Sequence, residues 1–149
     1  MTISKRFLTL LFSTLLLAYS QTVFSTEEQA VSIDELNGQA LHEKLVETAL
    51  KYDFYNKRCR GISVSGESYQ VERMFLKKYG LTINNFIKQY IDRDTRGYKE
   101  KLKKDIYLQL SQMGGCEKAK EKGLLKAFQE NLQSLFDKAE TSQWFPIEP

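Results

Sequence analysis

Apolar residues recur at the helical period through most of the sequence, and this pattern constrains the fold more than any other feature. The clearest stretch is Ile83 to Ile91, where apolar side chains fall at i, i+3, i+4, i+7 and i+8. Polar and apolar residues almost never alternate one by one, as they would in a half-buried strand. The sequence therefore predicts an all-α fold, and 149 residues allow one domain rather than two.

Capping residues and glycines divide the chain from Ser32 onward into four to five helices. Ser32 with Glu35 matches a capping box, although Asn37-Gly38 leaves open a separate turn before the first long helix. Gly80 and Gly114-Gly115 are stop signals, and Thr82 is well placed to cap the helix after Gly80. The expected helices cover residues 32–59, 71–79, 83–91, 98–113 and 116–139, with a polar corner at 93–97.

Short connections between amphipathic helices favour antiparallel neighbours, so we expect these helices to form a bundle. The bundle domain should span residues 26–140. A C-terminal tail should follow at 141–149, because its two prolines prevent the last helix from continuing.

The first 25 residues have the features of a secretory signal peptide. Lys5 and Arg6 precede an apolar stretch at 7–18, and no acidic residue occurs in the segment. As a helix this stretch reaches about 18 Å, short of the ~30 Å hydrocarbon core of a bilayer. We expect cleavage after Ser25, with Ser20 as the alternative, and no transmembrane segment in the mature form. The competing interpretation is an N-terminal membrane anchor.

Export makes the periplasm the expected compartment, with secretion from the cell as the alternative. The sequence has no Asn-x-Ser/Thr sequon, which favours a bacterial exported protein. Removal of the leader would lower the formal net charge from +3 to +1, because it carries two basic residues and no acidic one. A nearly neutral mature chain gives little support for nucleic acid as a partner.

Cys59 and Cys116 are the only cysteines, and both lie in the expected mature part. An even count in an exported chain predicts a disulfide, which would link the end of the first long helix to the start of the last. A redox or metal-binding pair is the alternative. Against it stand the absence of a Cys-x-x-Cys motif and the presence of only one histidine, His42. We therefore expect no metal and no other cofactor.

Motifs that would identify an enzyme are absent from the sequence, which has no P-loop, Gly-x-Ser-x-Gly or His-Glu-x-x-His. His42 lies among polar residues on the expected solvent side of its helix, so we predict a surface histidine. Two carboxylates can cleave a glycan without histidine. The pairs Glu67 with Glu72 and Asp92 with Asp94 therefore keep open a small hydrolase. Solvated surface acids explain them equally well, and we expect a protein that is not an enzyme.

Basic residues cluster in two rows at helical spacing, one in the expected helix 98–113 and one after Cys116. If the two helices pack as neighbours, the rows form one basic surface. Such a surface could attract an acidic protein or the phosphates of anionic envelope lipid or glycan. An ordinary solvated face, partly neutralised by interleaved acids, is the alternative. The candidate residues are Arg93, Arg96, Lys99, Lys103, Lys118 and Lys122.

A second candidate binding patch combines aromatic residues with arginines at the end of the first long helix. Tyr55, Arg58 and Arg60 give it the composition of a protein-interaction hot spot. Consecutive aromatic residues around a helix cannot all face one core. The alternative, which we expect, is that Trp144 from the tail packs over this helix end. Trp144 is a further candidate binding residue.

In size, leader, single disulfide and helical pattern the chain is similar to several classes of small exported protein. These include pilotins of secretion systems, lysozyme inhibitors and periplasmic immunity proteins, and no diagnostic motif matches any one of them. The combined features predict a helical module that binds a protein partner in the cell envelope, as an immunity-type, inhibitory or assembly-accessory protein. Binding of anionic envelope lipid or glycan, and a small carboxylate-dependent hydrolase, are the alternatives.

Overall fold

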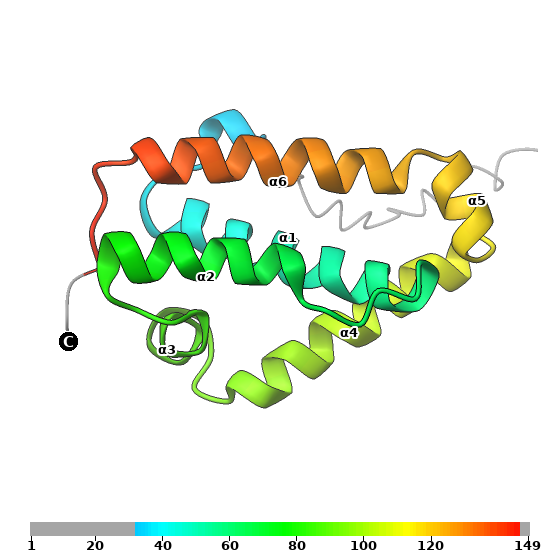
Figure 1. Ribbon diagram of the computed structural model, residues 1–149, viewed down its shortest axis with the longest axis horizontal. Helices are drawn as coiled ribbons and strands as arrows, with labels where there is room; N and C mark the ends of the chain where they lie inside the picture. The colour runs from blue at the N-terminus through cyan, green and yellow to red at the C-terminus, as the bar shows by residue number, and fades with distance from the viewer. Residues whose placement is uncertain (1–31, 147–149) are drawn as a thin grey trace, which may run out of the picture. The chain divides into compact units, whose positions relative to one another are not determined.

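The computed structural model describes residues 32–146, and the expected signal peptide at 1–25 lies outside these residues. The described part is helical and contains no strand, which confirms the predicted all-α fold (Figure 1). None of its helices combines the length and the apolar character needed to cross a membrane. In chain order the elements are η1 (Ile33–Glu35), α1 (Gly38–Cys59), α2 (Gly66–Tyr79), α3 (Ile83–Phe86), η2 (Ile87–Ile91), α4 (Thr95–Gln112), α5 (Cys116–Glu121) and α6 (Leu124–Thr141).

The central element is α1, which packs against α2, α4 and α6. In Figure 1, α2 and α6 run in the same direction, and α1 runs the opposite way. Leu45, Val46 and Ala49 of α1 have no exposed surface, and neither does Phe75 of α2. The hydrophobic core therefore surrounds α1 on several sides and is not confined to one stripe of that helix.

Most of the expected helix boundaries are confirmed. Ser32 caps the short helix η1, and α1 begins separately after Asn37. Gly80 ends α2 at a φ of 69°, a left-handed conformation that glycine adopts without steric cost. The Thr82 hydroxyl accepts a hydrogen bond from the Asn85 N–H at 3.1 Å and so caps α3.

Three boundaries differ from the expectation. The helix expected at 71–79 already begins at Gly66, as α2. The predicted last helix is divided at Gly123, whose φ of 81° interrupts the run between α5 and α6. The predicted polar corner at 93–97 is largely the first turn of α4, because the Asp94 carboxylate accepts a hydrogen bond from the Gly97 N–H at 2.9 Å. A side chain placed on Gly97 would collide with that carboxylate, so glycine permits this cap.

The predicted disulfide between Cys59 and Cys116 is present, with the two Cα atoms 5.4 Å apart. It joins the last residue of α1 to the first residue of α5. As a result α6, which follows α5, begins near the end of α1 and runs back along it. This antiparallel course brings the end of α6 close to the beginning of α1.

Candidate functional site

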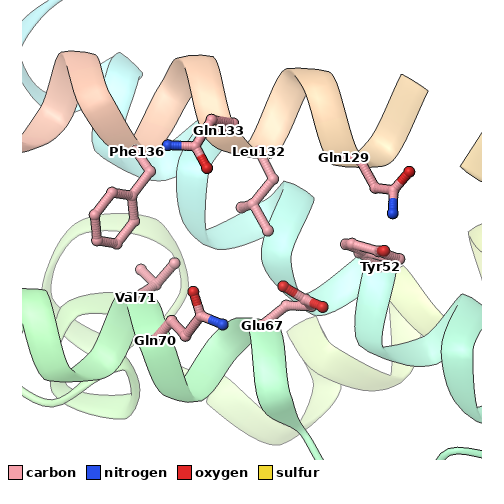
Figure 2. A pocket seen from close by; sticks show the side chains of 8 residues that line it. All are labelled: Tyr52, Glu67, Gln70, Val71, Gln129, Leu132, Gln133 and Phe136. Atoms are coloured by element: carbon pink, nitrogen blue, oxygen red, sulfur yellow. The ribbon is translucent and has the colours of Figure 1, made fainter. Parts of the chain in front are cut away.

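A pocket with a volume of about 420 Å³ lies between α2 and α6, with α1 behind it (Figure 2). Its walls exist because α2 and α6 both pack against α1, which holds them on either side of the pocket. The lining residues are Tyr52 from α1, Glu67, Gln70 and Val71 from α2, and Gln129, Leu132, Gln133 and Phe136 from α6.

Lys78 ties the last turns of α2 and α6 together beyond one end of the pocket. Its Nζ donates hydrogen bonds to the carbonyl oxygens of Ala139, Glu140 and Ser142 at 2.7–2.8 Å. Carbonyl groups from the last turn of α6 and from Ser142, the residue that follows it, thus share one ammonium group. The contact holds the two walls in a defined position relative to each other.

The pocket has one polar end and one mainly apolar end. Figure 2 shows Glu67, Tyr52 and Gln129 gathered at the polar end, and Phe136 with Val71 at the other. Gln70 and Gln133 project from opposite walls between them, and Leu132 covers the middle. Carboxamides both donate and accept hydrogen bonds, so these walls can pair with a ligand that presents both kinds of group.

The polar end of the pocket carries negative charge that Arg60 offsets only in part. Burial raises the pKa of Glu67, the nearby charge of Asp53 raises it further, and the charge of Arg60 opposes this in part. Burial and the charge of Glu67 also raise the pKa of Tyr52, whose hydroxyl hydrogen-bonds with Gln129 and with Arg60. A positively charged or hydrogen-bond-donating group is therefore favoured at this end.

Asp53 is engaged in holding the start of α2. Its Oδ1 accepts a hydrogen bond from the Glu67 N–H at 3.0 Å, and its Oδ2 accepts hydrogen bonds from the N–H and hydroxyl of Ser68 at 2.9 and 2.6 Å. The carboxylate thus satisfies backbone groups at the helix N-terminus. Its role is to position Glu67 at the pocket.

The carboxylate pairs that suggested a hydrolase are not brought together in the pocket. Of the four acids, Glu67 lines it and Glu72 does not. Asp92 accepts a hydrogen bond from the Asp94 N–H at 2.8 Å, and Asp94 caps α4. Within residues 32–146, no three His, Cys, Asp or Glu side chains are grouped closely enough to hold a metal ion.

The basic candidates lie on helices that pack against different partners. Because α4 packs on α1 and α5 packs on α6, the two lysine rows do not combine by packing of their helices. Arg93 and Arg96 are exposed. Two of the lysines form ion pairs, Lys103 with Glu100 at 2.9 Å and Lys118 with Glu121 at 2.8 Å. The other two donate hydrogen bonds, Lys99 Nζ to Asn84 Oδ1 at 2.6 Å and Lys122 Nζ to the Met113 carbonyl oxygen at 3.3 Å.

At the end of α1, the arginine and aromatic candidates make local contacts. Tyr55 is buried, with its ring centre 5.8 Å from that of Phe128. The Arg58 guanidinium lies 5.4 Å from the centre of the Tyr107 ring. Arg60 Nη1 donates to Asn56 Oδ1 at 3.0 Å. These side chains thus hold the helix end against α4 and α6.

The prediction that Trp144 packs over this end of α1 is wrong. Trp144 lies at the opposite end, with its ring centre 4.5 Å from that of His42 and its indole against the position of Gly38. The reason is the antiparallel course of α6, which delivers the tail to the beginning of α1. Tyr79, Phe86 and Tyr90 complete the aromatic cluster around the indole.

The prediction that His42 lies on the surface is also wrong, since its side chain has no exposed area. Nδ1 is 2.7 Å from the Gly38 carbonyl oxygen and Nε2 is 2.6 Å from the Tyr79 hydroxyl. Burial lowers the pKa of His42. Packing of neighbours around several sides of α1 buries this position, although the residues beside it in the sequence are polar.

The sequence pattern indicates only part of the pocket. Glu67 was considered as an acid, and Tyr52 belongs to the aromatic segment before Cys59. Gln70, Gln129 and Gln133 were missed, because glutamine is common on exposed helix faces and nothing in their spacing relates α2 to α6. Comparison of the chain with protein-family models, with curated proteins and with solved structures gave no significant match.

Proposed function

We propose that this protein is an exported binding module that takes a segment of a protein partner into the pocket between α2 and α6. The observation that carries the proposal is the convergence of three carboxamides, a phenol and a carboxylate on one concave site with apolar side chains between them. Ligand sites commonly combine an apolar surface with a few polar groups that fix orientation. Carboxamides are suited to a peptide backbone, which presents both donors and acceptors.

The shape of the surface next to the pocket supports a chain segment as the ligand. A second hollow, of about 840 Å³, shares Gln70 and Phe136 with the pocket and continues along α2 past Met74. Leu76, at its edge, is 46% exposed. A peptide can follow both hollows along the helix, whereas a small molecule would fill one of them.

The compartment belongs to the same proposal. The leader-like segment at 1–25 and the disulfide between Cys59 and Cys116 both support export to an oxidising compartment, with the periplasm as the first choice and secretion as the second. A partner in the cell envelope would encounter the protein there. Immunity-type, inhibitory and assembly-accessory roles all fit binding of this kind.

Affinity capture from an envelope extract tests the proposal, with the oxidised exported protein as bait. The substitution Gln133→Trp fills the pocket from an exposed position. The paired substitution Lys103→Glu with Lys118→Glu reverses one charge in each lysine row. We expect the wild type and the lysine variant to retain the same partner protein and Gln133→Trp to retain at least tenfold less. Equal capture by Gln133→Trp, or loss of capture only in the lysine variant, would contradict the proposal.

A further inference from the structure

We propose that the polar end of the pocket receives an arginine side chain of the partner segment. This inference deepens the proposed function and rests on it. The physical basis is that apolar side chains lead from Phe136 to a carboxylate, a carboxamide and a phenol at the other end (Figure 2). An arginine side chain has a matching order of groups, with an apolar stem that leads to a charged, planar head.

The acceptors at this end match the donors of a guanidinium. Glu67 supplies a carboxylate and Tyr52 a phenol oxygen, and the Gln129 carboxamide lies beside them with its nitrogen toward Tyr52 (Figure 2). A guanidinium has five N–H donors in a fixed plane, so it can bond to the carboxylate and to a neighbouring oxygen at the same time. The apolar stem would then lie over Val71 and Leu132.

The charge balance of the site also calls for a cation. None of the ion pairs within the described residues includes Glu67. Asp53 adds a second negative charge nearby, while its oxygens are occupied by the start of α2. Arg60, the neighbouring cation, hydrogen-bonds with Asn56 and with the Tyr52 hydroxyl, and it offsets the charge of Glu67 only in part. It does not line the pocket. An incoming guanidinium would therefore convert an unfavourable charge arrangement into a favourable one.

Other ligand groups satisfy the site less completely. A lysine ammonium is a compact point charge and lacks the planar fork that bridges a carboxylate and a neighbouring oxygen. A neutral sugar could use the carboxamides but would gain nothing from the charge of Glu67. An anionic group would be repelled by Glu67 and Asp53.

Side-chain amide resonances of Gln70, Gln129 and Gln133 report directly on this site in the full exported protein labelled with ¹⁵N. The probe is n-butylguanidinium, with n-butylammonium, butyrate and N-acetylglucosamine as comparison ligands. We expect millimolar n-butylguanidinium to shift these resonances saturably and to bind more tightly than n-butylammonium, and butyrate to leave them unchanged. Glu67→Gln should weaken binding of the guanidinium at least tenfold. The matched control Glu72→Gln, on the same helix outside the pocket, should bind as the wild type does.

Thermal unfolding of both variants confirms that each is folded before the titrations are compared. Equal affinity of Glu67→Gln and wild type for n-butylguanidinium would overturn the inference, as would the absence of a saturable shift or stronger binding of N-acetylglucosamine. The capture experiment separates the two proposals. A partner lost by Gln133→Trp but retained by Glu67→Gln would overturn the arginine inference and leave the proposed function standing, whereas a partner retained by both variants would overturn both.

Discussion

His42 is a buried histidine whose two ring nitrogens both have hydrogen-bond partners. Nδ1 donates to the Gly38 carbonyl oxygen, which leaves Nε2 to accept a hydrogen bond from the Tyr79 hydroxyl. Burial raises the pKa of Tyr79 to about 12, so this phenol keeps its proton and remains a donor. The pair therefore stabilises the neutral imidazole beneath Trp144.

Acidification should destabilise the protein through His42. Since the pKa of His42 is lower in the folded state than the ordinary value of 6.5, the unfolded chain binds the proton first as the pH falls. The stabilisation is complete above pH 6.5 and is lost below it, as the pH approaches the folded-state pKa. His42→Gln removes this titration and should lower the free energy of unfolding at pH 7 by about 1–3 kcal/mol through the lost hydrogen bonds.

Urea denaturation between pH 5 and pH 8 measures both effects. The free energy of unfolding of the wild type should fall more steeply toward pH 5 than that of His42→Gln, since other titrating groups are common to both proteins. Parallel curves for the two proteins would show that His42 is not held neutral in the way described.

At the residue scale, the sequence could predict the two cysteines but not the roles of His42 or the glutamines. His42 shares a row with Val46 and Ala49 at i+4 and i+7, which is the spacing of a buried face. Its polar neighbours in the sequence outweighed that signal. The row becomes informative only when α1 is known to be covered on several sides, which is a property of the whole fold.

At the scale of the elements, the start of α2 depends on a side chain from α1. Ser65 occupies the position that precedes α2, but its side chain makes no capping hydrogen bond. Asp53 instead accepts hydrogen bonds from the N–H groups of Glu67 and Ser68. The first turn of α2, and with it Glu67, is therefore oriented by tertiary packing.

Asp53→Ala should lower the free energy of unfolding by about 2–3 kcal/mol, because it leaves buried donors at the start of α2 without acceptors. Ser65→Ala is the matched control and should change stability by no more than about 0.5 kcal/mol. Chemical denaturation followed by circular dichroism gives both values. A larger effect from Ser65→Ala than from Asp53→Ala would reverse this assignment of the cap.

Lys78→Met should loosen the junction between α2, α6 and the tail. The substitution keeps the apolar stem but removes the ammonium that three carbonyl groups share, and we expect a loss of about 1–3 kcal/mol. Trp144 is the only tryptophan, so its fluorescence emission reports on the tail. The emission should move to longer wavelength in Lys78→Met and stay unchanged in Lys88→Met, an exposed control on η2. Unchanged emission in Lys78→Met would show that the tail does not depend on Lys78.

Helix boundaries set by local chemistry could be predicted, and those set by packing could not. Gly80, Thr82 and the Asn37 break were found because a cap or a left-handed glycine acts within a few residues. Gly123 was missed because it lies inside a continuous amphipathic run. The chain turns there so that α5 meets the disulfide while α6 packs on α1.

At the scale of the whole molecule, contacts between distant parts of the chain stabilise the bundle at both ends of α1. The disulfide joins the end of α1 to α5, and at the other end the tail packs Trp144 against His42. The disulfide was predicted correctly from the sequence, whereas the packing of Trp144 was predicted at the wrong end of α1. The two are connected, because a helix that starts at the disulfide and runs antiparallel to α1 must finish near its beginning.

Loss of the disulfide should cost about 4 kcal/mol in the chain-entropy model for two cysteines 57 residues apart. That is a large part of the roughly 5–15 kcal/mol typical of a whole domain. Urea denaturation of the oxidised protein and of the double variant Cys59→Ser with Cys116→Ser measures the difference. Equal stability of the two proteins would contradict the role given to this link.

The central claim is that the pocket between α2 and α6 is the surface that binds the partner, and site-specific photo-cross-linking in intact cells tests it most directly. A photoreactive p-benzoylphenylalanine replaces Leu76, exposed at the edge of the hollow that continues the pocket, in one protein and Lys104, an exposed residue of α4, in another. We expect one discrete cross-linked product from position 76, weakened by Gln133→Trp and by Glu67→Arg, and none from position 104. A product from position 104 and none from position 76 would contradict the claim.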